Sequence, residues 1–418
     1  MSRVLLVKPP FARLLGNTVY STYPLGLMRV AGMLEARGHE VRAYHDDVSN
    51  PAPIPLGGVG FGDMALRQPT SEELLPFIAE LESFDPDVVG VSYCTADRLS
   101  ALAVAWEAAV RGYRVVGGGI HPSLLGRQEC EILDAVVVGE GDHPAAAAVF
   151  ETDFTGELVV PKVDDLDATP TARECVIGWE RYTSFLRGMV QTQRGCPYSC
   201  GYCATPRVFG SRVRRRDPGA VREEVEELGV SGGRIIDDSF GVVWPHGEGV
   251  CRELGRTNFS WVCDMALQDI TVGRLQTMRA GGCTGVNLGI ESAVARWREL
   301  SGKHVVPGRP EEVVREAAEC GVGVVYYFMV GYPSETVDEM TQTLDLAERL
   351  RDLGARACIS VVTPYPKTRL WEAAYGSGEV PADFDWSGHI HQSSRMGLGA
   401  CTTEQWGAIL ERADRLNH

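Results

Sequence analysis

The stretch Gln193-Arg194-Gly195-Cys196-Pro197-Tyr198-Ser199-Cys200-Gly201-Tyr202-Cys203 places three cysteines within eight residues, with the spacing C-x3-C-x2-C. A structural zinc site normally takes four ligands, but no fourth cysteine follows at finger spacing and the next histidine is His246. Three thiolates suit a [4Fe–4S] cluster whose fourth iron stays open for a substrate or cofactor. The trio therefore predicts such a cluster, with a degenerate zinc site or chance clustering as the alternatives.

From Gly188, just before this trio, to about residue 370, short predicted strands alternate with predicted helices. The predicted strands span 189–193, 234–236, 260–263, 285–290, 324–330 and 357–362. The predicted helices span 218–228, 246–256, 271–280, 293–300, 310–320 and 335–353. Six such units are two short of a closed eight-stranded barrel, and the cysteines follow the first strand, on the face where barrel loops carry chemistry.

The first 150 residues show the same alternation. Strands are predicted over 3–7, 40–44, 87–91, 114–116 and 135–138, and helices over 25–37, 72–83 and 98–111. This α/β pattern predicts a doubly wound, Rossmann-like parallel sheet of about five strands, which binds ligands beyond the carboxyl ends of its strands. The predicted organisation is a first domain over 1–150, a linker over 151–188, a barrel over 189–370 and a short C-terminal cap over 371–418.

Composition excludes several classes of protein. Lys and Arg number 40 and Asp and Glu number 56, so the formal net charge is −16. An acidic chain repels a phosphate backbone, which predicts no nucleic-acid partner. The longest apolar run, 321–330, is too short to span a bilayer, and the first residues lack a signal-peptide pattern. We therefore expect no membrane association and a cytoplasmic location.

The cysteine stretch, with the aromatic Tyr202 just before the third cysteine, resembles the signature of the radical S-adenosylmethionine (SAM) enzymes. Weaker matches fall at other strand ends: Asp237-Asp238-Ser239-Phe240, Gly289-Ile290-Glu291-Ser292, Gly331-Tyr332-Pro333-Ser334-Glu335-Thr336, and Pro364-Tyr365-Pro366-Lys367-Thr368, with Lys367 where glycine is usual. The resemblance implies a partial (β/α)6 barrel of TIM type and a cluster, held by Cys196, Cys200 and Cys203, whose open iron binds SAM.

The same resemblance implies which residues contact SAM. The backbone of Tyr202 would lie near the adenine, and Asp238 and Glu291 would accept hydrogen bonds from the SAM ammonium or ribose hydroxyls. For these two carboxylates, helix N-capping is the alternative interpretation.

A doubly wound domain ahead of such a barrel resembles the cobalamin-dependent radical SAM group. Its glycine turns suit close approach of a flat corrin to the backbone. The resemblance implies cobalamin contacts at the residues of these turns, namely Ser92, Tyr93, Gly118, Gly119, His121, Gly139, Glu140 and Gly141. The D-x-H-x-x-G motif that supplies a cobalt-binding histidine elsewhere is absent, so Tyr93 or Cys94 is hypothesised to face the lower side of the metal. A scaffold without cobalamin is the alternative.

The group implies a class B methyltransferase that methylates an unactivated carbon or a similar centre. One SAM would methylate cobalamin, and a second would give the 5′-deoxyadenosyl radical that lets the substrate take the methyl group from methylcobalamin. The expected substrate is a small metabolite or natural-product intermediate, possibly carrier-bound or a peptide. The expected reductant is an external donor such as flavodoxin or ferredoxin.

The sequence leaves three alternative functions open. The first is a cobalamin-dependent rearrangement, ring contraction or cyclisation without methyl transfer. The second is methylthio transfer, which needs a second cysteine set, whereas Cys94, Cys130 and Cys175 are scattered along the first half. The third is a non-enzymatic cobalamin or Fe–S carrier or sensor.

Overall fold

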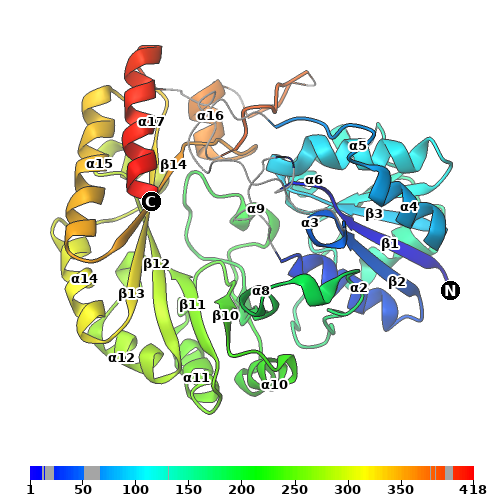
Figure 1. Ribbon diagram of the computed structural model, residues 1–418, viewed down its shortest axis with the longest axis horizontal. Helices are drawn as coiled ribbons and strands as arrows, with labels where there is room; N and C mark the ends of the chain where they lie inside the picture. The colour runs from blue at the N-terminus through cyan, green and yellow to red at the C-terminus, as the bar shows by residue number, and fades with distance from the viewer. Residues whose placement is uncertain are drawn as a thin grey trace.

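The computed structural model describes residues 1–11, 14, 23–50, 66–129, 131–376, 378–381, 383–390 and 399–418, so Cys130 lies outside the described residues. Two parallel sheets, each covered by helices, lie side by side in Figure 1. The α/β class and the predicted order, a doubly wound sheet followed by a partial barrel, are confirmed.

The first sheet has the strand order β2-β1-β3-β4-β5-β6, and every pairing is parallel. Its strands are β1 (Arg3–Lys8), β2 (Glu40–His45), β3 (Val88–Ser92), β4 (Arg114–Gly118), β5 (Ala135–Val138) and β6 (Gly156–Val159). Alternate residues of β1 enter two separate cores: Val4 and Leu6 pack with α2 (Leu25–Glu35), and Leu5 and Val7 pack with α4 (Leu75–Phe84) and α5 (Arg98–Ala109). Burial on both faces explains the continuous apolar runs of these strands.

The stretch interpreted as a linker contributes to both edges of this sheet. The strand β6 pairs with β5, and Val176 forms a parallel bridge with Ala43 of β2. The sequence missed β6 because it has only four residues and none of them is fully buried, so it carries no apolar run. The sheet therefore has six strands instead of about five.

The second sheet has the consecutive parallel order β14-β13-β12-β11-β10-β7. Its strands are β7 (Met189–Val190), β10 (Gly232–Ile235), β11 (Ser260–Met265), β12 (Cys283–Glu291), β13 (Gly323–Val330) and β14 (Arg356–Val361). The helices between them are α10 (Pro218–Leu228), α11 (Trp244–Leu254), α12 (Val272–Ala280), α13 (Ala295–Ser301), α14 (Arg309–Glu319) and α15 (Val337–Asp352). Five of them, α10, α11, α12, α14 and α15, cover the outer face of the sheet in Figure 1, as in a partial barrel. The short α13 instead packs Trp297 against Tyr332 and Leu370.

One predicted strand of the barrel, 189–193, is divided. After β7 the chain leaves the sheet, and β8 (Gln193–Arg194) forms a small antiparallel ladder with β9 (Arg214–Arg215). The cause is the buried carboxylate of Asp237, which accepts the backbone N–H of Thr192 at 2.6 Å and of Gln193 at 3.0 Å. These donors are consequently not available to a neighbouring strand.

The segment after residue 370 packs against both the barrel and the first domain. The helix α17 (Thr403–Asn417) packs against β14 and α15 and adds Trp406, Ile409 and Leu410 to the barrel core. Trp386 instead packs against α6 (Ile120–Leu125) of the first domain, where its ring lies 4.8 Å from that of His121. No helix among the described residues is both long and apolar enough to cross a membrane.

Candidate functional site

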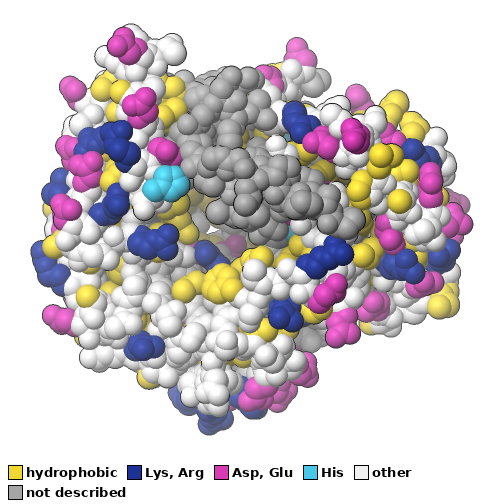
Figure 2. Space-filling view, viewed as in Figure 1, with side chains coloured by type: hydrophobic (Ala, Val, Ile, Leu, Met, Phe, Trp, Pro, Cys, Tyr) yellow, Lys and Arg dark blue, Asp and Glu magenta, His cyan; other side chains and the backbone are white. Residues whose placement is uncertain are grey.

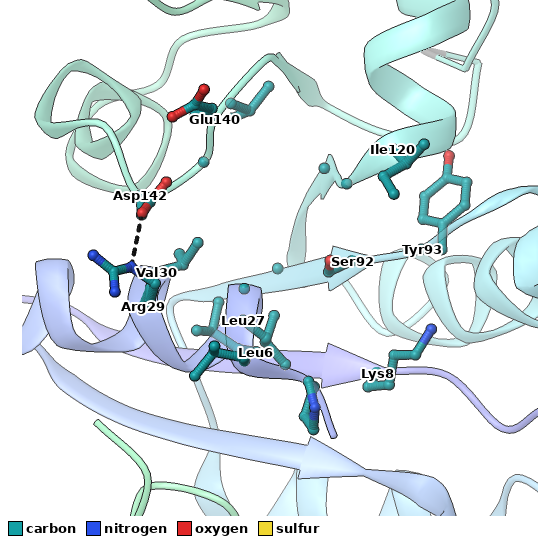
Figure 3. Close-up of a pocket in the computed structure, with 18 of the residues that line it drawn as sticks. Leu6, Lys8, Leu27, Arg29, Val30, Ser92, Tyr93, Ile120, Glu140 and Asp142 are labelled. Carbon is teal, nitrogen blue, oxygen red and sulfur yellow. Dashed lines mark hydrogen bonds and ion pairs between the residues drawn. The ribbon is translucent and has the colours of Figure 1, made fainter. Parts of the chain in front are cut away.

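A cavity of about 400 Å³ lies at the carboxyl ends of the first sheet, where that sheet faces the barrel. Its walls are largely apolar, and Figure 3 shows Leu6, Leu27, Val30 and Ile120 around it. The barrel closes the other side with side chains from the β7–β8 turn, the helix α9 (Thr205–Val208) and the end of β10, namely Gln191, Arg194, Val208, Phe209, Ile236 and Asp238. Both domains therefore build this cavity.

The structure gathers seven of the eight residues predicted to contact cobalamin around this cavity. The wall contains Ser92, Tyr93, Gly118, Gly119, Gly139, Glu140 and Gly141. His121 is not among the lining residues: it is buried in α6, and its Nδ1 lies 2.9 Å from Thr95 Oγ1. This places His121 behind the wall, where it supports Tyr93 through a ring contact of 5.9 Å.

The glycines give the cavity a bare main-chain floor. A Cβ added to Gly26 or Gly118 would meet no atom within 4 Å, so the backbone there is open to the cavity. Gly119 is different, because its φ of 105° and a Cβ position 2.5 Å from Tyr93 O make glycine necessary for the turn itself. An exposed backbone floor and apolar walls fit a large flat corrin. No histidine is among the described residues lining the cavity, in agreement with the missing D-x-H-x-x-G motif.

The three cysteines occupy the loop after β8, and all are free and half-buried. Gly201 lets the loop approach α13 closely, since a Cβ there would lie 2.0 Å from Leu300 O. The pKa of Cys196 is raised to about 11, chiefly by burial and also by the nearby Asp238, Cys200 and Cys203. The thiols are thus close enough to act on one another electrostatically, and they fit a cluster with three protein ligands.

Among the described residues, no three Cys, His, Asp or Glu side chains converge closely enough to hold a single metal ion. A four-iron cluster makes a different demand, because each thiolate binds a different iron atom.

Glu291 lies at the end of β12, beside the cysteine loop, and is buried. Its Oε1 accepts a hydrogen bond of 2.7 Å from Tyr202 Oη and lies 3.3 Å from Lys303 Nζ. Its φ of 71° is in the left-handed region, which a glutamate rarely adopts. Strain of this kind is typical of functional positions, and it turns the carboxylate toward the predicted SAM contact Tyr202.

Asp238 connects the cavity with the cysteine loop. It lines the cavity, and its Oδ2 accepts the backbone N–H of Gly195 at 2.9 Å, one residue before Cys196. Burial raises its pKa. The neighbouring Asp237 holds the β7–β8 turn instead, so only the second carboxylate of the Asp-Asp pair faces the site.

Lys303 is a site residue that sequence reasoning missed. Its Nζ lies 3.3 Å from Glu291 Oε1. Burial raises the pKa of Cys200, and the positive charge of Lys303 opposes that rise. The one available signal was a lysine directly after Gly302 at the end of α13, which by itself indicates only a helix terminus.

Comparison with known proteins agrees with this arrangement. Residues 190–347 match the model of the radical SAM superfamily, and residues 13–149 match that of the B12 binding domain. An uncharacterized methyltransferase, PH0819, of Pyrococcus horikoshii is 28% identical over 98% of this chain and 91% of its own length. Cytidylyl-2-hydroxyethylphosphonate methyltransferase of Streptomyces wedmorensis is 24% identical over 92% of this chain and 87% of its own.

A solved structure shares the fold. TsrM of Kitasatospora setae, a radical SAM methyltransferase with cobalamin and a [4Fe–4S] cluster bound, superposes with a TM-score of 0.64 at 19% identity, over 88% of this chain and 74% of TsrM. A second structure of TsrM contains its tryptophan substrate and a SAM analogue.

Proposed function

Because this chain belongs to the cobalamin-dependent radical SAM enzymes, whose methyltransferases it resembles, we propose that it methylates an unactivated carbon, or a similar centre, of a small metabolite or natural-product intermediate. Its cofactors are a [4Fe–4S] cluster, SAM and cobalamin. When bound, they supply a methyl group from one SAM and a 5′-deoxyadenosyl radical from a second.

The proposal depends most on Asp238, which lines the cavity and is also hydrogen-bonded to the cysteine loop. One side of the cavity is the glycine floor of the first domain, and the other includes a carboxylate hydrogen-bonded to the cysteine loop. Two cofactors bound at these places would face a common space, where a substrate can meet both. Holding reactants in one orientation supplies a large part of the rate enhancement of such reactions.

Each group of residues has a distinct task under this proposal. Cys196, Cys200 and Cys203 hold three irons, and Asp238 and Glu291 accept hydrogen bonds from SAM. The glycine floor positions the corrin, and the apolar walls exclude water, which protects a reactive radical. The mechanism requires no side chain as an obligatory acid or base.

A small-molecule substrate is supported by the tryptophan-bound relative of the same fold. Charged side chains of both signs are interspersed on the face seen in Figure 2, and they form no basic stripe there of the kind that nucleic-acid binding requires. The electron for SAM cleavage would come from an external donor such as flavodoxin or ferredoxin.

The test is anaerobic reconstitution with iron, sulfide and hydroxocobalamin, followed by SAM and a reductant. We expect about four irons and one cobalt per chain, and formation of 5′-deoxyadenosine. Two variants separate the cofactors: Cys200→Ala should abolish iron loading, whereas Gly118→Leu should fill the cavity and abolish cobalt binding while iron is retained. Zinc in place of iron, or cobalt binding unaffected by Gly118→Leu, would refute the proposal.

A further inference from the structure

Five charged side chains are buried together between the first domain and the barrel. Arg29, Glu140 and Asp142 come from the first domain, and Arg194 and Arg214 come from β8 and β9. None of these side chains is more than 6% exposed. Burying a charge is expensive unless its partners are held in good geometry, so the arrangement of these five groups is tightly constrained.

Arg194 is the centre of this network. Its Nη1 donates to Glu140 Oε2 and to Asp142 Oδ1, both at 2.8 Å, and its Nη2 donates to Asp142 Oδ2 at 2.9 Å. The remaining donors are directed at Gln191 Oε1, at 3.2 Å from Nε and 3.1 Å from Nη2. A guanidinium whose three nitrogens are all engaged in a planar fork has almost no freedom to rotate.

The two carboxylates are fixed from their other sides as well. Arg214 holds Glu140 with two bonds of 2.7 and 2.6 Å. Arg29 donates to Asp142 Oδ2 at 3.1 Å, the contact drawn as a dashed line in Figure 3. The acceptors of Arg194 are therefore not mobile surface groups. Arg214 and Arg29 hold them in fixed positions on the first domain.

The sequence positions of these residues show which two loops the network connects. Glu140 and Asp142 flank Gly141 in the glycine loop 139–142, which lines the cavity. Arg194 ends β8, two residues before Cys196, and so stands at the start of the cysteine loop. One guanidinium thus joins the loop that would bear the corrin to the loop that would bear the cluster.

We propose that Arg194 is a positioning residue that fixes the distance and orientation between the cobalamin and cluster sites by locking the glycine loop 139–142 to the cysteine loop. The inference rests on the proposed function, which assigns the two cofactors to these loops. The contacts of Arg194 themselves do not depend on methyl transfer. Replacing a member of the network should loosen the loop in the opposite domain, because the two loops share no other fixed charge contact of this kind among the residues described.

The first experiment is amide hydrogen exchange on the full chain, with and without hydroxocobalamin, for wild type and Asp142→Asn. The substitution keeps the shape and removes the charge that Arg194 requires. We expect exchange at residues 195–203, in the other domain, to accelerate by about tenfold or more, since breaking a buried pair is strongly destabilising. Because exchange needs no turnover, this outcome is independent of whether the chain methylates anything.

The matched control is Glu224→Gln. Glu224 is also mostly buried between two arginines, Arg173 and Arg216, but it does not contact the glycine loop. Its replacement should leave exchange at 139–142 and at 195–203 unchanged. Equal acceleration of both loops by the control would overturn the proposal, as would an Asp142→Asn effect confined to the first domain.

Arg194→Lys gives the reciprocal test, and it substitutes for Asp142→Asn if that variant does not fold. Lysine keeps the charge but cannot span two carboxylates with a fork. We expect faster exchange at 139–142 and, in reconstituted protein, a changed magnetic interaction between Co(II) and the reduced cluster in the electron paramagnetic resonance spectrum. An unchanged interaction together with unchanged exchange would refute the positioning role.

Discussion

At the scale of single residues, Lys303 sets the electrostatics of the cysteine loop. Burial raises the pKa of Cys200, and Lys303 opposes that effect because a nearby positive charge favours the thiolate. The same ammonium pairs with Glu291, whose carboxylate would otherwise be buried with Tyr202 Oη alone among the contacts described here. Lys303 therefore favours the charged form of a cluster ligand.

Lys303→Met should raise the pKa of Cys200 further in metal-free protein. The alkylation rate of a thiol follows its thiolate fraction, so the pH at which Cys200 reacts half-maximally with iodoacetamide should move upward. Peptide mass spectrometry after timed alkylation from pH 7 to 10 measures this shift. The exposed Lys367 supplies the matched control, and Lys367→Met should leave the profile in place. A downward or absent shift in Lys303→Met would contradict this assignment.

The cysteines and Asp238 could be predicted as site residues from the sequence because each belongs to a local pattern at a strand end. It could not identify Lys303 or Arg194 as site residues. Arg194 meets its partner Glu140 across 54 positions and across two domains, and an arginine before a glycine carries no local sign of that contact.

At the scale of elements, the turn between β13 and α15 depends on one buried carboxylate. Glu335 accepts the backbone N–H of Gly331 at 2.7 Å and of Tyr332 at 3.0 Å. It is fully buried, and burial raises its pKa to about 7. The folded protein therefore holds a proton here in a pH range where the unfolded chain has lost it.

This shift makes the barrel less stable as pH rises. A carboxyl group with a raised pKa in the folded state contributes stability that is present below pH 4.5 and is lost as pH rises through 7. Between pH 5 and 8 the free energy of unfolding should fall more in wild type than in Glu335→Gln, by about 2–3 kcal/mol. Urea unfolding of both proteins across this range measures the difference. The exposed Glu372→Gln should follow wild type, and a wild-type curve parallel to that of Glu335→Gln would contradict the prediction.

Elements with strong periodicity or clear ends were predictable. The helix over 218–228 has the bounds of α10, because Asp217 caps it and Gly229 ends it in a left-handed conformation. The division of strand 189–193 was not predictable, because it depends on Asp237 more than forty residues away. Tyr326 and Tyr327 are consecutive in β13 and therefore lie on opposite faces of the sheet. Tyr326 packs into the barrel core, whereas Tyr327 interacts with Arg234 of β10 and Asp264 of β11.

At the scale of the whole molecule, the segment that follows the barrel packs back against the first domain. Trp386 packs edge-on against His121, with ring centroids 4.8 Å apart, and stacks on Trp371 of α16 (Arg369–Tyr375) at 6.0 Å. It is 5% exposed. This contact and the Arg194 network both hold the first domain to the barrel, but on different elements. No local pattern could reveal a pairing between residues 121 and 386.

Trp386→Ala should destabilise the packing of α6 by about 3–5 kcal/mol, as expected for removing a buried tryptophan. Amide exchange in α6 at increasing urea concentration measures the loss. Trp106→Ala is the matched control, since Trp106 is 57% exposed and its removal should change stability by less than about 0.5 kcal/mol. Equal losses of stability in the two variants would show that Trp386 does not hold the first domain to the barrel.

The bare floor at Gly26 and Gly118 has an evolutionary consequence. Neither glycine has a positive φ, and a Cβ at either would meet no other atom within 4 Å. Folding alone therefore exerts no pressure to keep them, unlike Gly119. If a descendant of this gene lost its use for the macrocycle, these two positions would be the first to drift toward larger residues, and the drift would leave the scaffold intact.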